Sequence, residues 1–173
     1  MCMDNDGRTA LFLSARYGHD SLVRLLLRKC PLELYTKDHY SATPLFAALR
    51  NGHLQVAKLL LITDDTCIGT RDCFDRTLMW WARRSRNTQL IQLIHHYSTK
   101  AGLQVDESDM STETGPVTFN PTSNWCNVCT LCIRDGSDYY KCGICNGGDF
   151  AICLECFKFG VECQNSSHRW ELH

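Results

Sequence analysis

Residues 38–61 read DHYSATPLFAALRNGHLQVAKLLL, and this stretch decides the fold of the front half of the chain. Thr43 is a residue type that caps helices, and Pro44 suits the first helical turn, where an N–H has no intrahelical partner anyway. Gly52 provides a break after that helix. The apolar side chains from Leu54 onward give a second helix a broad apolar face. The stretch therefore predicts two short helices separated by a turn.

The same pattern returns every 34 residues along the front half. Gly18-His19 recurs as Gly52-His53, and four further classes of residue keep the same step. These classes are Asp4, Asp38 and Asp72; Thr9, Thr43 and Thr77; Phe12, Phe46 and Trp80; and Leu25, Leu59 and Leu93. A fixed period of this length indicates stacked units, each of which buries its apolar face against a neighbour.

The T-P-L, G-H and L-L motifs at residues 43–45, 52–53 and 60–61 resemble the ankyrin repeat. Tetratricopeptide repeats share the period, but their marks do not occur in register. The resemblance covers residues 4–97 and implies a mostly α-helical solenoid of about three repeats in a domain spanning residues 1–97. The degraded third copy, rich in Arg and His, is typical of a polar terminal cap. The front end has no such cap, so we expect a longer parent protein or a partner to cover the first repeat.

The resemblance also implies where partners bind, because ankyrin arrays use the loop tips and the exposed side of the first helix of each repeat. Tyr, Phe and Arg among these positions are residue types enriched in binding hot spots. The alternative is that they are solvated loop residues in a purely structural stack. The candidates are Arg8, Arg16, Tyr17, His39, Tyr40, Arg50, Phe74, Arg76 and Arg84.

The 34-residue period stops at Ser98, and residues 98–124 are predicted to form a flexible linker. Residues 106–116 are acidic, rich in Ser and Thr, and poor in large apolar side chains. Such a composition buries too little surface to offset the entropy lost on ordering. We therefore expect two independent units, with the second over residues 125–173.

Eight of the twelve cysteines fall within residues 126–163, mostly as C-x-x-C pairs. Two intervening residues let a tight turn direct both thiolates at one tetrahedral ion, and three such pairs followed by a Cys/His pair are strong evidence for zinc. Four pairs supply eight ligands, enough for two closed structural Zn²⁺ sites. In chain order the candidates are Cys126, Cys129, Cys142, Cys145, Cys153, Cys156, Cys163 and His168.

The intervals between these pairs, with Tyr140 two residues before the second pair and Phe150 before the third, resemble the ZZ-type zinc finger. The resemblance implies a small cross-braced domain with short β and α elements. One zinc is then held by Cys126, Cys129, Cys153 and Cys156, and the other by Cys142, Cys145, Cys163 and His168. It also implies peptide capture near Asn127 and Asp149. Because only Asp149 keeps a carboxylate there, we expect capture of a basic N-terminal peptide to be weak.

Two alternatives for the ligands stay open in the sequence. Cys132 forms a second possible pair with Cys129, although pairing of Cys126 with Cys129 leaves a loop to Cys142 of the length typical of ZZ fingers. His173 could replace Cys163 or His168, but a last residue is expected to fray.

Composition excludes several functions. The net charge is -1, and residues 126–173 carry 4 Lys/Arg against 6 Asp/Glu, which disfavours nucleic acid. No signal peptide or membrane-spanning run is evident, so we expect a cytoplasmic or nuclear protein with reduced thiols. The sequence predicts a zinc-binding adaptor for protein or peptide partners, with no membrane, small-molecule substrate or enzyme activity. A RING-like ubiquitin-ligase component is the alternative.

Overall fold

A computed structural model of the protein describes residues 2–105, 120 and 122–173. The chain divides into two compact units, Met1–Val117 and Thr118–His173. The predicted flexible linker falls partly on residues 106–119 and 121, which lie outside the described residues.

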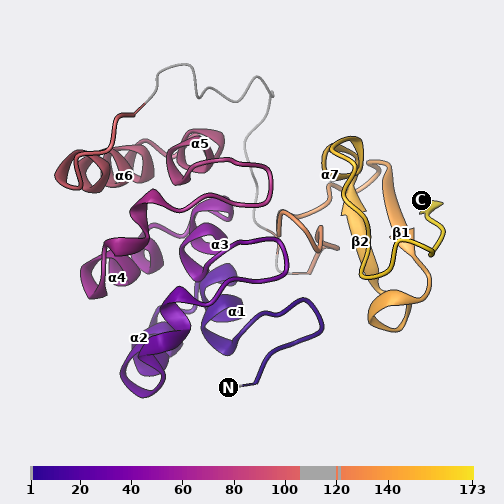
Figure 1. The fold of residues 1–173 in the computed structure, drawn as a ribbon, viewed down its shortest axis with the longest axis horizontal. Coiled ribbons are helices and arrows are strands. Elements are labelled where there is room, and N and C mark those ends of the chain that lie inside the picture. The colour runs from indigo at the N-terminus through magenta and orange to yellow at the C-terminus, as the bar shows by residue number, and fades with distance from the viewer. Residues whose placement is uncertain (1, 106–119, 121) are drawn as a thin grey trace. The chain divides into compact units, whose positions relative to one another are not determined.

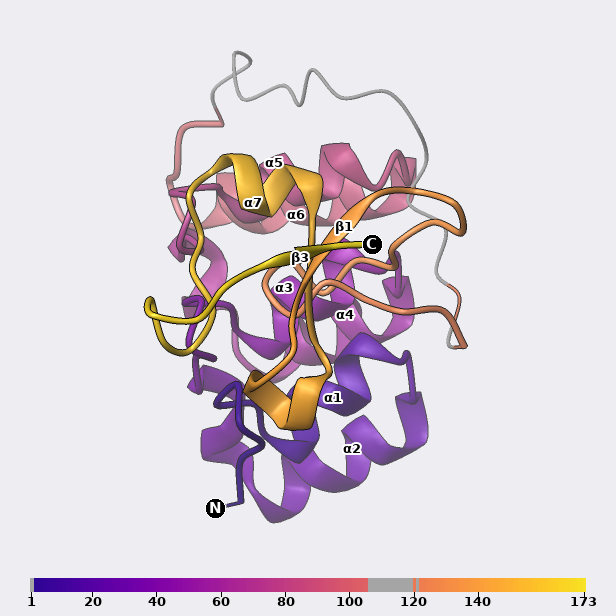
Figure 2. The same ribbon diagram turned by 90° about the vertical axis from the view of Figure 1, so that its right-hand side faces the viewer.

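The described residues of the first unit form three helix pairs. Figures 1 and 2 show these pairs stacked in chain order. The first helices of successive pairs contact one another, and so do the second helices, which gives two layers. Short 3-10 turns join the pairs, at Pro31–Tyr35 and Thr66–Gly69. The pairs are α1 (Ala10–Arg16) with α2 (Asp20–Lys29), α3 (Pro44–Arg50) with α4 (Leu54–Thr63), and α5 (Leu78–Arg84) with α6 (Thr88–Lys100). The predicted mostly helical stack is confirmed.

The first helices begin at the periodic threonines, but only two of the three threonines cap with their side chains. The Thr9 Oγ1 accepts a hydrogen bond from Phe12 N at 3.2 Å, and the Thr77 Oγ1 accepts one from Trp80 N at 3.0 Å. Thr43 occupies the same backbone position before Pro44, yet its side chain makes no capping bond. Thr43 therefore stands at the predicted N-cap position, but the prediction that its side chain caps the helix is wrong.

The periodic aspartates close the loop before each first helix. In the second loop the Asp38 Oδ1 accepts from the backbone N–H groups of Tyr40 and Ala42, both at 2.9 Å. In the third, the Asp72 Oδ1 accepts from Phe74 N at 2.9 Å and Arg76 N at 3.1 Å. One carboxylate oxygen thus accepts hydrogen bonds from two backbone N–H groups that have no partner in a helix or sheet.

The second oxygen of each buried aspartate binds an arginine of the preceding repeat. The Asp38 Oδ2 accepts from the Arg8 Nε at 3.2 Å. The Asp72 Oδ2 accepts from the Arg50 Nη2 at 2.6 Å and from the Trp81 Nε1 at 2.7 Å. The side chains of Arg50 and Asp72 are both fully buried. The aspartates recur once per repeat because each one closes its own loop and also joins its repeat to the preceding one.

The Gly-His motif makes a further joint between the first two repeats. The His53 Nε2 lies 2.8 Å from the Arg16 carbonyl oxygen, so the ring donates through this nitrogen. Gly18 has a φ of +71°, and a Cβ there would come within 2.6 Å of the His53 Nδ1. Only glycine fits this position, because both its backbone angle and the close ring exclude a side chain.

The first unit extends beyond its predicted end at residue 97. Helix α6 continues to Lys100, Ser98 is buried, and Leu103 N donates to the Ser98 carbonyl at 2.9 Å. Gly102, with a φ of +69°, supplies the left-handed backbone after the helix. The sequence misplaced this boundary because the last helical turn, Ser98 to Lys100, is polar and lacks the apolar period.

The second unit contains a three-stranded antiparallel sheet of order β2-β1-β3 and one short helix. Phe150 and Ile152 are fully buried, and Tyr140 stacks on Phe157 with ring centroids 3.6 Å apart. This apolar core is small for an independently folded unit. The elements are β1 (Tyr139–Cys142), β2 (Phe150–Cys153), α7 (Leu154–Lys158) and β3 (Glu171–Leu172).

Asp72→Asn tests the buried joint between the second and third repeats. The change leaves Arg50 buried beside a neutral amide, and removal of one partner from a buried ion pair costs about 3 kcal/mol or more of the free energy of unfolding. Asp75→Asn is the matched control, because Asp75 is exposed and its pair with Arg71 contributes about 1 kcal/mol at most. Urea unfolding followed by tryptophan fluorescence measures both. Equal losses in the two variants would contradict the role of Asp72.

His53 makes the stability of the first unit depend on pH. Burial lowers the pKa of His53 below its usual value, against the opposite effect of the hydrogen bond to the Arg16 carbonyl. The folded state therefore prefers the neutral ring, and stability is complete above the unfolded pKa of about 6.5 and is lost as pH falls below it. His53→Gln keeps a donor but does not titrate. We expect the wild-type protein to lose more stability than this variant between pH 7.5 and 5.5. Parallel losses in both proteins would rule out His53 as the cause.

Candidate metal centres

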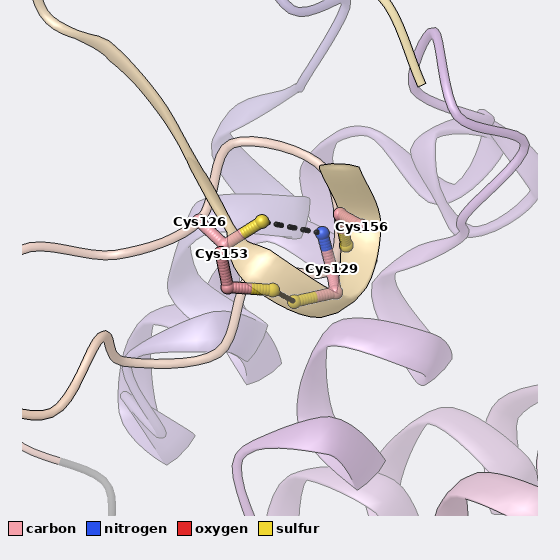
Figure 3. Close-up of side chains that lie close together, drawn as sticks. All are labelled: Cys126, Cys129, Cys153 and Cys156. Carbon is pink, nitrogen blue, oxygen red and sulfur yellow. Dashed lines mark hydrogen bonds between the residues drawn. The ribbon is translucent and has the colours of Figure 1, made fainter. Parts of the chain in front are cut away.

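The first group of candidate ligands consists of Cys126, Cys129, Cys153 and Cys156 (Figure 3). Their sulfur atoms all lie within 4.8 Å of one another. Cys153 ends strand β2, and Cys156 lies in the first turn of α7. Cys129 N donates to the Cys126 Sγ at 3.5 Å, which is typical of a tight turn that directs both sulfurs to one side.

The turn that carries Cys126 and Cys129 is fixed by the backbone around it. Cys126 N donates to the Leu131 carbonyl, and Thr130, with a φ of +62°, returns its N–H to the Cys126 carbonyl at 2.9 Å. Asn127 joins this turn to strand β2. Its N–H donates to the Ala151 carbonyl at 2.8 Å, while its Oδ1 accepts from Ala151 N at 2.9 Å.

The second group consists of Cys142, Cys145, Cys163 and His168, whose ligand atoms also lie within 4.8 Å of one another. Cys142 ends strand β1, and Cys145 begins a 3-10 turn at Cys145–Gly148. Cys145 N donates to the Cys142 Sγ at 3.4 Å, which repeats the turn geometry of the first group.

Sequence reasoning missed one residue that shapes the second group, namely Asn165. Its Oδ1 accepts from Ser167 N at 3.0 Å, and its carbonyl accepts from His168 N at 3.1 Å and from the Cys163 Sγ at 3.1 Å. These bonds fold the loop so that Cys163 and His168 approach each other. An asparagine followed by two serines is a turn signal that could have identified it.

The distances between ligand atoms fit tetrahedral zinc. Zn–S bonds of about 2.3 Å at tetrahedral angles place two sulfurs about 3.8 Å apart. The Sγ atoms of Cys129 and Cys153 are 3.9 Å apart. With a Zn–N bond of about 2.0 Å, the sulfur–nitrogen separation becomes about 3.5 Å. The His168 Nδ1 lies 3.6, 3.4 and 3.8 Å from the sulfurs of Cys142, Cys145 and Cys163.

The thiols in each group cannot all ionise unless a cation compensates their charge. Burial raises the pKa of Cys126, but hydrogen bonds from the neighbouring thiols outweigh it and hold this pKa well below its usual range. Hydrogen bonds with other thiols of the group raise the pKa values of Cys129 and Cys156 well above their usual range. One thiolate therefore forms at the expense of the others. A bound dication would remove this conflict and accept four ligands at once.

The two groups lie at opposite ends of the hairpin formed by β1 and β2. Cys153 pairs with Tyr139 at one end of the ladder, and Cys142 pairs with Phe150 at the other. Of the four ligand pairs along the chain, the first and third share one group and the second and fourth share the other, which is the cross-braced arrangement that the ZZ resemblance implies. Each group therefore brings one end of the hairpin next to a segment distant in sequence.

Cys132 and His173, the two open alternatives, lie outside both groups. The Cys132 Sγ donates to the Asn120 carbonyl at 3.2 Å. His173 extends the sheet by exchanging backbone hydrogen bonds with Tyr139, at 2.9 and 3.1 Å, and its ring stacks on Tyr139. Its position at the end of the chain is ordered by this pairing.

The two residues expected to take part in peptide capture are both engaged within the second unit. Asn127 is buried and uses its Oδ1 to hold β2. Asp149 is exposed, and its Oδ1 lies 3.3 Å from the Lys141 Nζ. The lysine offsets the charge that would attract a free amino terminus. Weak capture of a basic N-terminal peptide stays a prediction.

The candidate partner-binding residues of the first unit differ in their exposure. Arg8, Arg16, Tyr40 and Arg50 are buried, and Arg8 and Arg50 are held by the aspartates described above. The expectation of exposed side chains does not hold for these four. Tyr17, Phe74, Arg76 and Arg84 are partly exposed, and His39 is exposed. Arg76 lies over the rings of Phe74 and Trp80, with its Cζ at 4.7 and 4.1 Å from their centroids.

Comparison with known families supports the assignment of the first unit. A family model described as ankyrin repeats in three copies matches residues 1–72. The N-terminal region therefore carries ankyrin repeats. No ZZ-type family is detected in the C-terminal region. A search of curated proteins gives no match. Among the described residues, none of the helices has the length and apolar character needed to cross a bilayer.

Cys142→Ser and Cys132→Ser form a matched pair that tests the ligand assignment. Cys142→Ser should lose zinc from the second group, and because metal binding supplies much of the folding energy of so small a unit, it should also unfold this unit. Cys132→Ser should keep about two zinc ions per chain, the number that two four-ligand groups hold. Release of zinc by denaturation with a chromogenic chelator gives the content. Loss of zinc from Cys132→Ser with retention in Cys142→Ser would overturn the assignment.

Proposed function

We propose that this protein is a zinc-binding adaptor, in which the ankyrin stack binds one protein and the C-terminal zinc module binds another. The observation that carries the proposal is the combination, in one chain, of ankyrin repeats with two closed four-ligand groups. Neither element supplies a reaction of its own. Both are architectures that present a rigid surface to a partner.

The loop tips of the ankyrin stack are the proposed site for the first partner. The aspartate-closed loops hold their tips rigid, so little conformational entropy is lost on binding. His39 is exposed at one tip, and the next tip carries Phe74 beside Arg76. An aromatic ring packed against a guanidinium is a combination found in binding hot spots.

The C-terminal unit is proposed to be a ZZ-type module with two structural zinc ions. With four protein ligands on each ion, no position is left for an activated water, so the proposal assigns no catalysis to this unit. The zinc would instead hold a small surface in place. Exposed apolar side chains on that surface include Ile144, Phe159 and Leu172.

Affinity purification of the tagged full chain from cells tests whether the two units bind separate partners. His39→Ala combined with Phe74→Ala removes side chains at the loop tips, and Cys142→Ser disrupts the zinc module. Ile62→Ala is the control, because Ile62 is exposed on α4 away from the tips. We expect each of the first two variants to lose a different set of partners, and Ile62→Ala to lose none.

Two outcomes would contradict the adaptor. One is a single set of partners that all variants retain, which would show that neither surface binds. The other is transfer of ubiquitin by the purified chain from a charged conjugating enzyme, which would instead favour the RING-like alternative. The Cys163-x4-His168 spacing, where RING domains have a final C-x-x-C pair, argues against that alternative.

A further inference from the structure

The joint between the second and third repeats shows how this stack binds a carboxylate. The Asp72 Oδ2 accepts from the Arg50 Nη2 at 2.6 Å and from the Trp81 Nε1 at 2.7 Å. The Arg50 Cζ also lies 4.4 Å from the centroid of the Trp81 ring. An arginine stacked on an indole thus supplies a charged N–H and a neutral ring N–H to the same carboxylate oxygen.

A second arginine–tryptophan pair in the third repeat reaches the surface. The Arg76 Cζ lies 4.1 Å from the centroid of the Trp80 ring and 4.7 Å from that of Phe74. All three side chains are half-buried, whereas those of Arg50 and Trp81 are buried. We name Phe74, Arg76 and Trp80 the arginine–aromatic site. The two rings restrict the guanidinium, so less conformational entropy is lost when it binds a partner.

The equivalent arginine in the first repeat shows that this position of the repeat suits carboxylates. Arg8 precedes Arg76 by two periods. Its Nη1 lies 2.8 Å from the Asp6 Oδ2, and its Nε lies 3.2 Å from the Asp38 Oδ2. In the third repeat Phe74 stands at the position of Asp6. Because a guanidinium has five N–H donors, Arg76 can bind a carboxylate in addition to its contacts within the chain.

The segment around the arginine–aromatic site carries an excess of positive charge. Residues 73–87 contain four arginines and one acidic residue, Asp75, which pairs with Arg71. Arg84 follows Trp80 by four residues on α5, so the two side chains lie on the same side of the helix. This charge attracts an acidic segment and favours its association. A run of acidic side chains can then meet Arg84 while one carboxylate binds Arg76.

Nucleic acid is the other polyanion that a basic and aromatic surface can bind. Single strands bind by stacking successive bases on open aromatic rings. At the arginine–aromatic site Arg76 lies over both Phe74 and Trp80, and the edge-to-face contact of Trp80 with Trp81 occupies more of the indole. These contacts leave less ring surface for a base. A carboxylate needs only the N–H groups at the edge of the guanidinium, so the geometry favours an acidic peptide.

We propose that the arginine–aromatic site binds the carboxylate of an Asp or Glu in an acidic peptide segment of a partner protein. The proposal rests on the proposed function, in which the loop tips of the ankyrin stack bind a partner, and it names the chemistry of that partner. Arg76 and the Trp80 indole N–H donate to the bound carboxylate, as Arg50 and Trp81 do to Asp72. Further acidic side chains of the segment face Arg84.

Fluorescence anisotropy of a dye-labelled peptide rich in Asp and Glu, titrated with the full chain, tests this proposal. A matched peptide carries Asn and Gln in place of every acid. We expect only the acidic peptide to bind. Arg76→Ala should weaken its binding at least about tenfold, because a charge-assisted hydrogen bond is lost. Arg24→Ala removes the same charge from an exposed position of α2 and should change the affinity little.

Two conservative variants separate an effect on binding from an effect on folding. Arg76→Lys keeps the charge but lacks the planar fork, and Trp80→Phe keeps a ring beside Arg76 but lacks the N–H. Circular dichroism establishes that each variant is folded. We expect both to bind the acidic peptide more weakly than the wild-type chain, with a loss of roughly fivefold for Trp80→Phe, the effect of one neutral hydrogen bond.

Three results would overturn the proposal. The first is that the acidic peptide does not bind, or binds no better than its amide version. The second is that Arg76→Ala and Arg76→Lys bind it as well as the wild-type chain. The third is tighter binding of a single-stranded RNA that Arg76→Ala removes, which would assign the site to nucleic acid. If the peptide fails while His39→Ala with Phe74→Ala still loses partners in cells, the adaptor stands and only the carboxylate chemistry is wrong.

Discussion

The C-terminal unit gathers four potential metal ligands at each end of one hairpin, and this clustering is the constraint around which its small fold is arranged. Its strands have four, four and two residues, and Phe150 and Ile152 supply much of its small apolar core. Such elements bury too little surface to offset the entropy of folding. Seven sulfur atoms and one ring nitrogen are nevertheless gathered into two compact groups. We propose that metal ions supply the missing free energy and that, through the cross-braced ligand pairs, they stabilise both ends of the hairpin.

The ankyrin unit also consists of elements that bury little surface by themselves, and it is stabilised by stacking of repeats. Each helix pair is too thin to bury its own apolar face, so stability comes from the joints between pairs. These joints are partly polar: a buried carboxylate such as Asp72 closes its own loop and binds Arg50 of the preceding repeat. His53 donates a hydrogen bond to the Arg16 carbonyl in the repeat before it. Both units therefore use a few directional bonds to fix the geometry of contacts that apolar burial alone would leave variable.

The helix pairs and the eight candidate ligands could be predicted from the sequence because fixed spacing carries their chemistry. Other features could not be predicted, because they depend on three-dimensional neighbours. Arg8 and Arg50 are expected on the loop tips or on the exposed side of a first helix, but both are buried in ion pairs with Asp38 and Asp72. Those aspartates belong to the following repeat, and no local sequence pattern marks the pairing. The last turn of α6 was assigned to the linker because it is polar. Asn127 was read as a binding residue, whereas its amide ties the first cysteine turn to β2.

X-ray absorption at the zinc edge of the full chain tests the central claim most directly, because it counts ligand atoms around the bound ions. Two ions that share seven sulfurs and one nitrogen have on average 3.5 sulfurs and 0.5 nitrogens each. We expect this average, with Zn–S distances of about 2.3 Å and no oxygen ligand. A clear oxygen contribution from water, or an average of three sulfurs or fewer, would contradict two closed structural sites.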